Sequence, residues 1–247
     1  MSDVEVRRGT LGTVRNAAVL LDLLSQGPAF QQLSDLAERS SLSLPTVHRL
    51  LRSLVDAGLV QQDPASSRYG LGPELVRLSE RYLDRLPLLQ TLKPYLADLR
   101  NRTAATVQAA VRVRATAVYV ERIDGADSVL LRRGGRTAPI GTTAAGRLLA
   151  GYAGSEEWKE LVELDDRLQL ADLERWSKAD HLVADVDGVR GQVEVAVPIR
   201  RDDGTAAATL AAVGGPPTFT REQLVADVLP ELVQTAAMVE AMTGHGS

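Results

Sequence analysis

The stretch LSLPTVHRLLRSL, residues 42–54, decides the fold of the first part of the chain. It starts with two helix signals: Ser43 can act as an N-cap, and Pro45 falls in the first turn, where a missing amide hydrogen costs nothing. Apolar side chains then recur at helical spacing on one face: Val47, Leu50, Leu51, Leu54 and Val55. Gly58 supplies a stop signal. The spacing predicts an amphipathic helix that buries this face.

The opposite face of this helix is polar and carries no acidic residue before Asp56. It consists of Thr46, His48, Arg49, Arg52 and Ser53. For an isolated helix, such a face is most simply a solvated surface. The neighbouring elements therefore decide whether the face has a function.

The neighbouring elements complete a recognisable order. Helical periodicity predicts a helix over residues 14–24 and a shorter one over 31–40. Two strand-like runs, 59–62 and 68–71, follow the third helix and are joined by a turn-rich segment. Three short helices followed by a β-hairpin are typical of a winged helix-turn-helix, a fold that binds double-stranded DNA.

In that fold the third helix would enter the major groove, where base edges are read. Arg49 and Arg52 are the leading contacts, because arginine can bond guanine edges or clamp a phosphate. Arg68 on the wing can reach a phosphate or the minor groove, although exposed arginines in turns are common. The remaining predicted contacts are Ser43, Thr46, His48 and Ser53.

The bulk composition fits a cytoplasmic regulator with an acidic second domain. The 247 residues carry a net charge of −4. A small DNA-binding domain joined to an acidic second domain would give such a total, so the overall charge does not exclude DNA binding. With no cysteine, disulfides, thiolate zinc sites and cysteine nucleophiles are excluded, and a reducing compartment is favoured. No secretion signal or membrane-span-length apolar segment is evident, so we expect no membrane partner.

After residue 72 a connector helix is predicted to end at Pro87. Leu75, Leu78, Tyr82 and Leu86 form an apolar stripe on it that would suit packing against a partner copy. The predicted domains are a DNA-binding domain (1–72), a linker and dimerisation helix (73–87) and a larger domain (88–247).

The larger domain is predicted to be α+β with an antiparallel sheet. Expected strands cover residues 106–112, 117–123, 128–132, 192–200 and 205–213. Expected helices cover residues 88–102, 142–152, 155–164, 173–179 and 220–242. A turn at Asp202-Asp203-Gly204 separates the last two strands.

Several stretches make the chain resemble the IclR family of transcriptional regulators. Residues 42–51 and 68–72 are similar to the family's recognition helix and wing exit, and residues 139–150 and 195–199 to motifs of its second domain. The resemblance implies a GAF- or PAS-like effector domain, with a small-molecule pocket between sheet and helices, in a homodimer or homotetramer. A dimer would read a pseudo-palindromic operator.

The resemblance further places the effector pocket at Thr142, Thr143, Glu194 and Ala196. The two threonines could instead simply cap a helix. Gly141 replaces the family's usual histidine, and Glu194 stands where a small or neutral residue is common.

An inward Glu194 would disfavour an anionic effector and favour a hydroxyl, amine or amide group, whereas an outward one would be a surface charge. Arg132 and Arg133 could bind an acidic ligand, but adjacent strand residues face opposite ways, so at most one of them points inward.

No catalytic, metal or cofactor motif was found. The three histidines, His48, His181 and His245, have no metal-ligand spacing, and no nucleophile elbow, Walker loop or dinucleotide fingerprint occurs. We therefore expect no enzyme activity and no cofactor. The alternatives to an effector-responsive regulator are a DNA-binding protein whose second domain only oligomerises and an enzyme with an appended helix-turn-helix.

Overall fold

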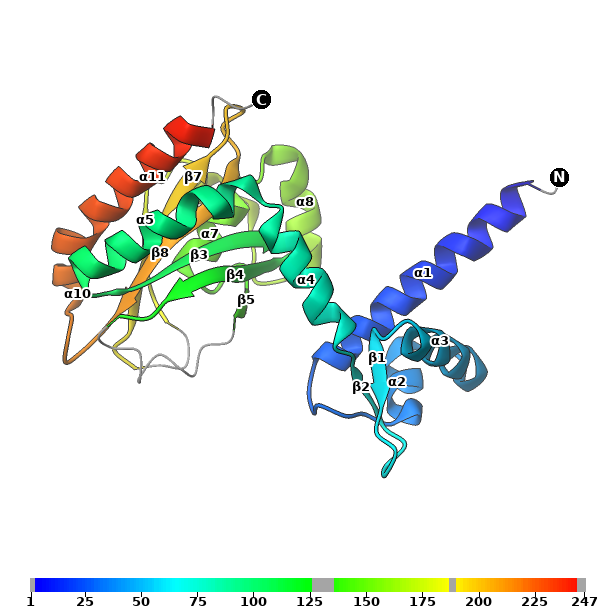
Figure 1. The fold of residues 1–247 in the computed structure, drawn as a ribbon. Helices are drawn as coiled ribbons and strands as arrows, with labels where there is room; N and C mark the ends of the chain where they lie inside the picture. Colours follow the sequence, from blue (N-terminus) through cyan, green and yellow to red (C-terminus); the bar gives the residue numbers. More distant parts are fainter. Residues whose placement is uncertain (1–2, 126–135, 187–189, 244–247) are drawn as a thin grey trace. The chain divides into compact units, whose positions relative to one another are not determined.

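A computed structural model describes residues 3–125, 136–186 and 190–243, with side chains from residue 12 onward (Figure 1). The chain divides into two compact units, one ending at Arg85 and the other starting at Leu86.

The first unit is the predicted winged helix-turn-helix. Its elements are α1 (Asp3–Ser25), α2 (Leu33–Ser40), α3 (Leu44–Asp56), β1 (Val60–Gln62), β2 (Tyr69–Leu71) and α4 (Glu74–Asp84). Leu20, Leu36 and Leu51 are fully buried where the first three helices meet. The apolar face of α3 is thus buried in the core of the unit, as its spacing predicts.

A buried glutamine that the sequence pattern did not single out joins the helices to the wing. The backbone of Gln31 pairs with Tyr69 of β2 in both directions, at 2.8 and 2.9 Å. Its side-chain amide donates to the Leu23 and Gln26 carbonyls at 3.0 and 2.8 Å, and Arg39 donates to its oxygen at 2.7 Å. Satisfying every polar group of this buried side chain fixes the wing against the ends of α1 and α2.

The second unit is built on a six-stranded antiparallel sheet with the order β5-β4-β3-β8-β7-β6. The strands are β3 (Thr106–Val113), β4 (Thr116–Ile123), β5 (Thr137–Pro139), β6 (Leu182–Asp185), β7 (Val193–Arg200) and β8 (Ala206–Gly214). This confirms the predicted α+β class with an antiparallel sheet.

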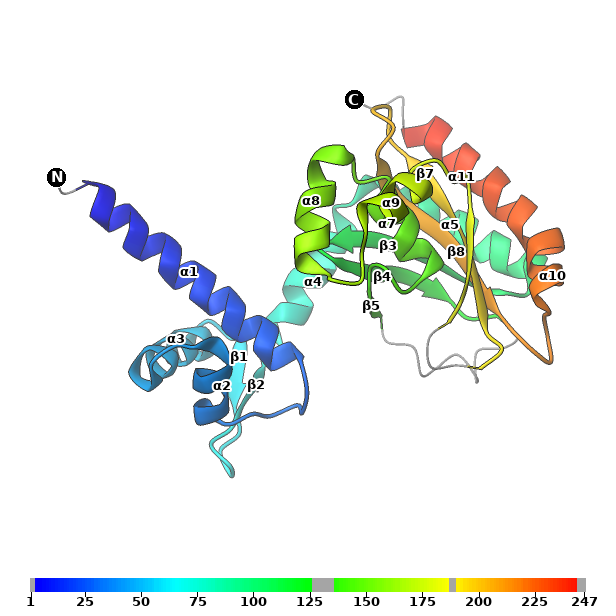
Figure 2. The same cartoon turned by 180° about the vertical axis from the view of Figure 1, so that it is seen from behind.

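Helices cover both faces of this sheet. On one face lie α5 (Pro87–Thr103) and α11 (Leu229–Thr243), which pack against each other (Figure 1). On the other lies α7 (Ala144–Gly151), with α9 (Leu170–Trp176) and α8 (Ser155–Leu164) beside it (Figure 2). The closing helix is interrupted, because a π-helical segment, Leu224–Val228, separates α10 (Arg221–Gln223) from α11.

The boundaries differ from expectation at particular places. The short strands β5 and β6 at the sheet's two edges were not predicted, since three or four residues are too few to show strand alternation. α9 begins at Leu170, three residues before its predicted start. The expected strand 128–132, which includes Arg132, lies outside the described residues, as do Arg133 and His245.

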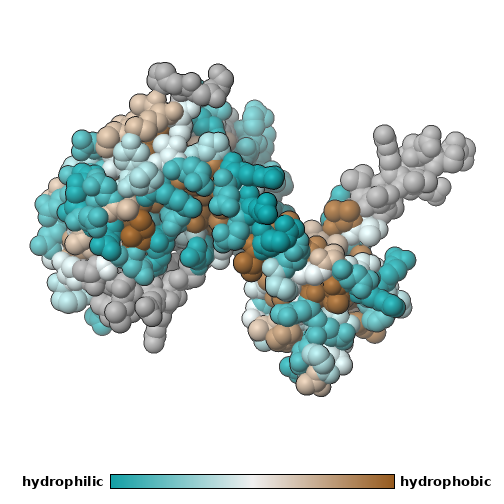
Figure 3. Space-filling model, viewed as in Figure 1, coloured by the Kyte–Doolittle hydropathy of each residue, from teal (hydrophilic) through white to brown (hydrophobic). Residues whose placement is uncertain are grey.

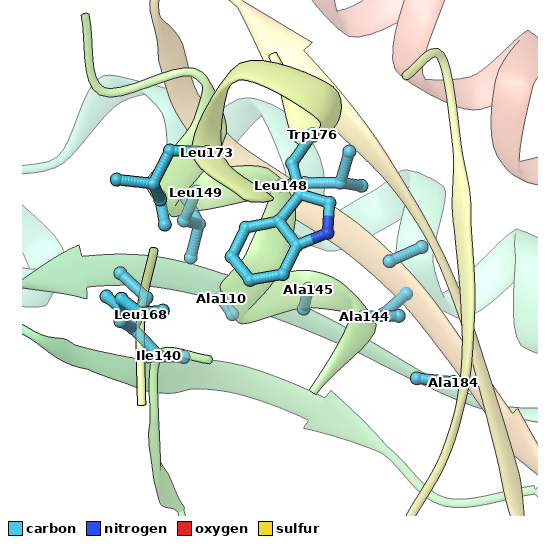
Figure 4. Packing of buried hydrophobic residues seen from close by; sticks show 14 of the residues in the cluster. Ala110, Ile140, Ala144, Ala145, Leu148, Leu149, Leu168, Leu173, Trp176 and Ala184 are labelled. Carbon is cyan, nitrogen blue, oxygen red and sulfur yellow. The ribbon is translucent and has the colours of Figure 1, made fainter. Parts of the chain in front are cut away.

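The packing beneath α7 is made largely of small side chains. Ala144 and Ala145 of α7 face alanines of the sheet, so that this short helix lies close to the strands. Figure 4 shows Trp176 of α9 beside α7, with Ile140 and Leu168 together at one end of the cluster and Ala184 towards the other. The close fit leaves the start of α7 directly over the strands.

The surface view shows a mostly hydrophilic face with apolar side chains in small groups (Figure 3). Among the described residues, none of the helices combines the length and apolar character that crossing a membrane requires.

The wing exit allows a sharp test of the first unit. A Cβ added at Gly72 would lie 2.1 Å from the Gly58 carbonyl oxygen. Because backbone must move to relieve this clash, Gly72→Ala should lower the free energy of unfolding by at least about 1–3 kcal/mol. Urea denaturation followed by circular dichroism measures the change.

Gly12→Ala is the matched control, because nothing lies within 4 Å of a Cβ at that helical position. It should stabilise α1 by about 0.5–1 kcal/mol. Equal stability of the Gly72→Ala protein and the wild type would refute the close packing at the wing exit.

Candidate functional site

The polar face of α3 is open to solvent, as the helical spacing requires. His48, Arg49, Arg52 and Ser53 are exposed, and Thr46 is half-buried. Within the described residues neither Arg49 nor Arg52 forms an ion pair, and Asp56 is the first acid of the helix. The two guanidinium groups therefore keep their charge and donors available for an external anion.

Ser43 occupies the N-cap position of α3, as predicted. Its side chain does not, however, form the hydrogen bond to a backbone amide that an N-cap residue usually forms. Its hydroxyl instead shares a 2.8 Å hydrogen bond with the Thr46 hydroxyl. An N-cap side chain bonds the second or third amide of the helix. Here the second residue is Pro45, which has no amide hydrogen, and the third, Thr46, offers its hydroxyl instead.

The wing turn is held by Asp63. Its carboxylate accepts hydrogen bonds from the Ser66 hydroxyl and, at 3.0 Å, from the Ser66 amide. The Ser66 hydroxyl, with help from the Ala65 amide, lowers the pKa of Asp63. Arg68 follows this turn with an exposed side chain and no ion pair among the described residues. The wing thus presents one free cation beside a fixed turn.

In the second unit, the two threonines before α7 have different roles. Thr143 is the N-cap, because its hydroxyl oxygen accepts a 3.0 Å hydrogen bond from the Gly146 amide. The Thr142 hydroxyl donates to the Pro139 carbonyl at 2.8 Å and closes the preceding turn. Both side chains thus have structural partners at the start of α7.

Glu194 of β7 points inward and is 2% exposed. One carboxylate oxygen accepts a 2.8 Å hydrogen bond from the Tyr119 hydroxyl, and the other a 3.1 Å bond from the Ala145 amide. Burial raises the pKa of Glu194, and these two bonds oppose that rise. The site is therefore a buried carboxylate held between a phenol and the first turn of a helix.

Tyr119 of β4 is a site residue that the sequence analysis missed. It is 7% exposed, and burial, followed by the negative charge of Glu194, raises the pKa of its hydroxyl. The hydroxyl is consequently a neutral donor towards Glu194. A tyrosine inside an apolar strand gives no sequence signal of this role, since its partner lies 75 residues further along the chain.

The other two positions noted in the sequence are explained by packing. Ala196 is fully buried in the apolar cluster beneath α7. At Gly141, a Cβ would lie 2.7 Å from a Leu168 methyl carbon. Leu168 therefore fills the space that a histidine at position 141 would need. Among the described residues, no group of histidine and acidic side chains could hold a metal ion.

The buried carboxylate should make the free energy of unfolding of this domain depend on pH in a characteristic way. The ordinary pKa of 4.5 applies in the unfolded chain, and the folded value is higher. As pH rises above 4.5, the unfolded state releases its proton first, so stability falls by at most about 1.4 kcal/mol per pH unit until the folded carboxyl ionises. Glu194→Gln should lack this fall.

Urea denaturation from pH 4.5 to about 7 measures the free energy of unfolding of both proteins. In the difference between them, the contributions of all other titrating groups cancel. Any hydrogen bond that the amide fails to replace lowers stability by the same amount at every pH, because glutamine does not titrate. Glu163→Gln, at an exposed position on α8, is the control. Parallel stability curves for wild type and Glu194→Gln would contradict a raised pKa.

Comparison with known proteins gives consistent matches to both units. A family model described as the IclR helix-turn-helix domain matches residues 13–64. Another, described as the bacterial transcriptional regulator IclR C-terminal domain, matches residues 80–241.

Two curated relatives illustrate the similarity. The HTH-type transcriptional regulator XynR of Escherichia coli (strain K12) is 30% identical over 152 residues, which span 61% of this chain and 60% of that protein. The HTH-type transcriptional regulator KipR of Bacillus subtilis (strain 168) is 26% identical over 239 residues, 92% of this chain and 94% of that protein. The match to XynR thus spans about three fifths of its length.

Among solved structures, an IclR homolog from Microbacterium hydrocarbonoxydans, complexed with 4-hydroxybenzoate, shares the fold. It has a TM-score of 0.65 and 21% identity, and the match covers 93% of this chain and 98% of that one. Because the C-terminal family model alone matches more than half of the sequence, the chain belongs to the IclR family of bacterial transcriptional regulators.

Proposed function

We propose that this protein is a transcription regulator that binds operator DNA through its first unit and a small-molecule effector through its second. The observation that carries the proposal is the exposed, acid-free face of α3, on which Arg49 and Arg52 lie without ion-pair partners in the described part of the chain. A regulator acting on DNA would work in the cytoplasm.

The proposed DNA contacts follow the geometry of the fold. The N-terminal half of a recognition helix reads base edges in the major groove, and arginine can bond guanine with two hydrogen bonds. Arg49 lies in that half of α3, and Arg52 continues the same exposed face about one turn later. Both are the proposed base contacts, and Arg68 reaches a phosphate or the minor groove from the wing. The shorter side chains position the helix on the backbone: Ser43, Thr46, His48 and Ser53.

Two copies of the chain would bind a pseudo-palindromic site through equivalent helices. The surface proposed for their contact is the apolar stripe of α4. None of the residues of α4 is buried, and two residues of the stripe, Leu78 and Tyr82, are 45% and 58% exposed. Apolar side chains this exposed along one helix suit an interface with a second copy, in a dimer or, through further contacts, a tetramer.

The second unit would hold the effector on the sheet face beneath α7, near Thr142, Thr143, Glu194 and Ala196. The homolog from Microbacterium hydrocarbonoxydans, which was solved with 4-hydroxybenzoate, supports small-molecule binding within this fold. An effector regulates when it binds one arrangement of the protein more tightly than another and so shifts the balance between them.

The DNA proposal is tested with fragments from upstream of the protein's own gene and, if these fail, with genome-wide fragments. Arg49→Ala and Arg52→Ala should each weaken binding to the specific fragment by about 5- to 150-fold, since a bidentate base contact contributes about 1–3 kcal/mol. Fluorescence anisotropy at fixed salt, with scrambled competitor DNA, measures the loss.

Arg175→Ala is the matched control, because this exposed arginine belongs to the second unit and pairs only locally, with Asp172. It should leave affinity unchanged. Equal binding of specific and scrambled DNA by the wild-type protein, in every fragment and with effector candidates present, would instead favour a second domain that only oligomerises or an enzyme.

The proposed interface is tested by Leu78→Lys. Leu78 is 45% exposed in the single chain, so lysine should leave the fold intact while placing a charge in the apolar contact. We expect at least a tenfold weaker dimer in analytical ultracentrifugation, because burying an unpaired charge costs several kcal/mol. Glu80→Lys, on another side of α4, is the control. It changes the net charge more than Leu78→Lys does but should not alter sedimentation.

A further inference from the structure

Tyr119 and Glu194 meet across the face of the sheet that carries α7. Directly paired residues of neighbouring antiparallel strands lie on the same face. Tyr119 pairs with Ala110 of β3, which pairs with Thr209 of β8. Glu194 pairs with Val213 of β8, four residues from Thr209 and therefore on the same face. Their hydrogen bond thus bridges β4 and β7, over the two strands that lie between them.

Small side chains make this bridge possible. Ala110 and Ala211 lie on the intervening strands and are fully buried, as is Ala196 beside Glu194 on β7. Alanine leaves the space above the sheet open, and the tyrosine ring and the glutamate chain lie in that space. The bridge therefore lies where the effector is proposed to bind, beside Ala196 and the start of α7.

The carboxylate of Glu194 also occupies the start of α7. The first amides of a helix lack partners within the helix and attract anions. Here the Ala145 amide is bound by Glu194 and the Gly146 amide by Thr143. The Ala144 amide also acts on Glu194, by lowering its pKa. The chain thus supplies its own carboxylate to the groups that would otherwise bind the carboxylate of a ligand.

We infer that Glu194 is a specificity-determining residue, a built-in carboxylate that excludes carboxylate effectors from the start of α7. This inference rests on the proposed effector site. Each carboxylate oxygen accepts one hydrogen bond here, although a carboxylate can accept about four in all. The remaining lone pairs of a carboxylate can only accept hydrogen bonds, so the effector class is a neutral molecule that donates them from hydroxyl, amine or amide groups.

A carboxylate ligand is disfavoured for two reasons. To reach the Ala145 amide it must displace Glu194, which leaves a buried carboxylate without that hydrogen bond. If both carboxyl groups stay, either two like charges lie within a few ångströms or a proton must be bound, and both cost free energy in a poorly solvated site. The exclusion should disappear when the side chain of Glu194 is shortened.

The decisive experiment uses acetate, which matches the atoms that Glu194→Ala removes beyond Cβ. Melting temperatures of the full-length protein are measured in sodium acetate and in sodium chloride of equal ionic strength. Acetate should raise the melting temperature of Glu194→Ala by about 2–4 °C relative to chloride, because it binds only the folded state. Wild type and Glu163→Ala, an exposed control, should show no difference between the salts.

Glu194→Ser is measured alongside, so that one variant keeps a polar partner for Tyr119 if alanine unfolds the domain. Absence of acetate stabilisation in the folded variants would overturn the inference. So would calorimetric binding of benzoate to the wild type that is as tight as its binding to Glu194→Ser.

Neither measurement involves DNA, so the inference and the proposed function can fail separately. Loss of specific DNA binding by the wild type, together with acetate stabilisation of Glu194→Ala, would remove the regulator proposal and leave the carboxylate site standing. Specific DNA binding without acetate stabilisation would do the reverse.

Discussion

The second unit depends on how the start of α7 is held against the sheet. Thr143 and Glu194 take the amides of Gly146 and Ala145, and alanines on both sides let the helix approach the strands closely. A helix of only eight residues gains little from its own hydrogen bonds, so its position comes from these end contacts and from packing. The proposed effector site lies at these same contacts.

In the first unit the comparable constraint is the buried face of α3. Val47, Leu50 and Leu51 must pack against α1 and α2, and this fixes which residues turn outward. The orientation of Arg49 and Arg52 is therefore a consequence of core packing. Gln31 adds the second constraint, because its backbone and side-chain hydrogen bonds tie β2 to the same helices. One small core therefore holds both α3 and the wing.

The two units treat charge in opposite ways. The polar face of α3, which we propose contacts DNA, keeps Arg49 and Arg52 exposed and without ion pairs among the described residues, where a phosphate backbone could attract them. The second unit buries the carboxylate of Glu194 and satisfies it from within, with Tyr119 and the Ala145 amide. The overall charge of −4 is thus no guide to the partner of either unit. The partners follow from where the charges lie.

The sequence alone determined the helices with strong periodicity, the wing, the long strands and the outward face of α3, because these follow from local spacing and from the chemistry of caps and turns. It also left two orientations open for Glu194, inward to the proposed effector site or outward to solvent. Only the tertiary structure decided between them, since the direction of Glu194 depends on pairing with β8 and on Tyr119, 75 residues away. The edge strands β5 and β6 and the Gln31 junction were likewise beyond sequence reasoning, because the strands are too short to show alternation and their pairing partners, like those of Gln31, lie far away in the chain. The loss of the Ser43 capping bond, by contrast, has a local cause, since Pro45 offers no amide hydrogen.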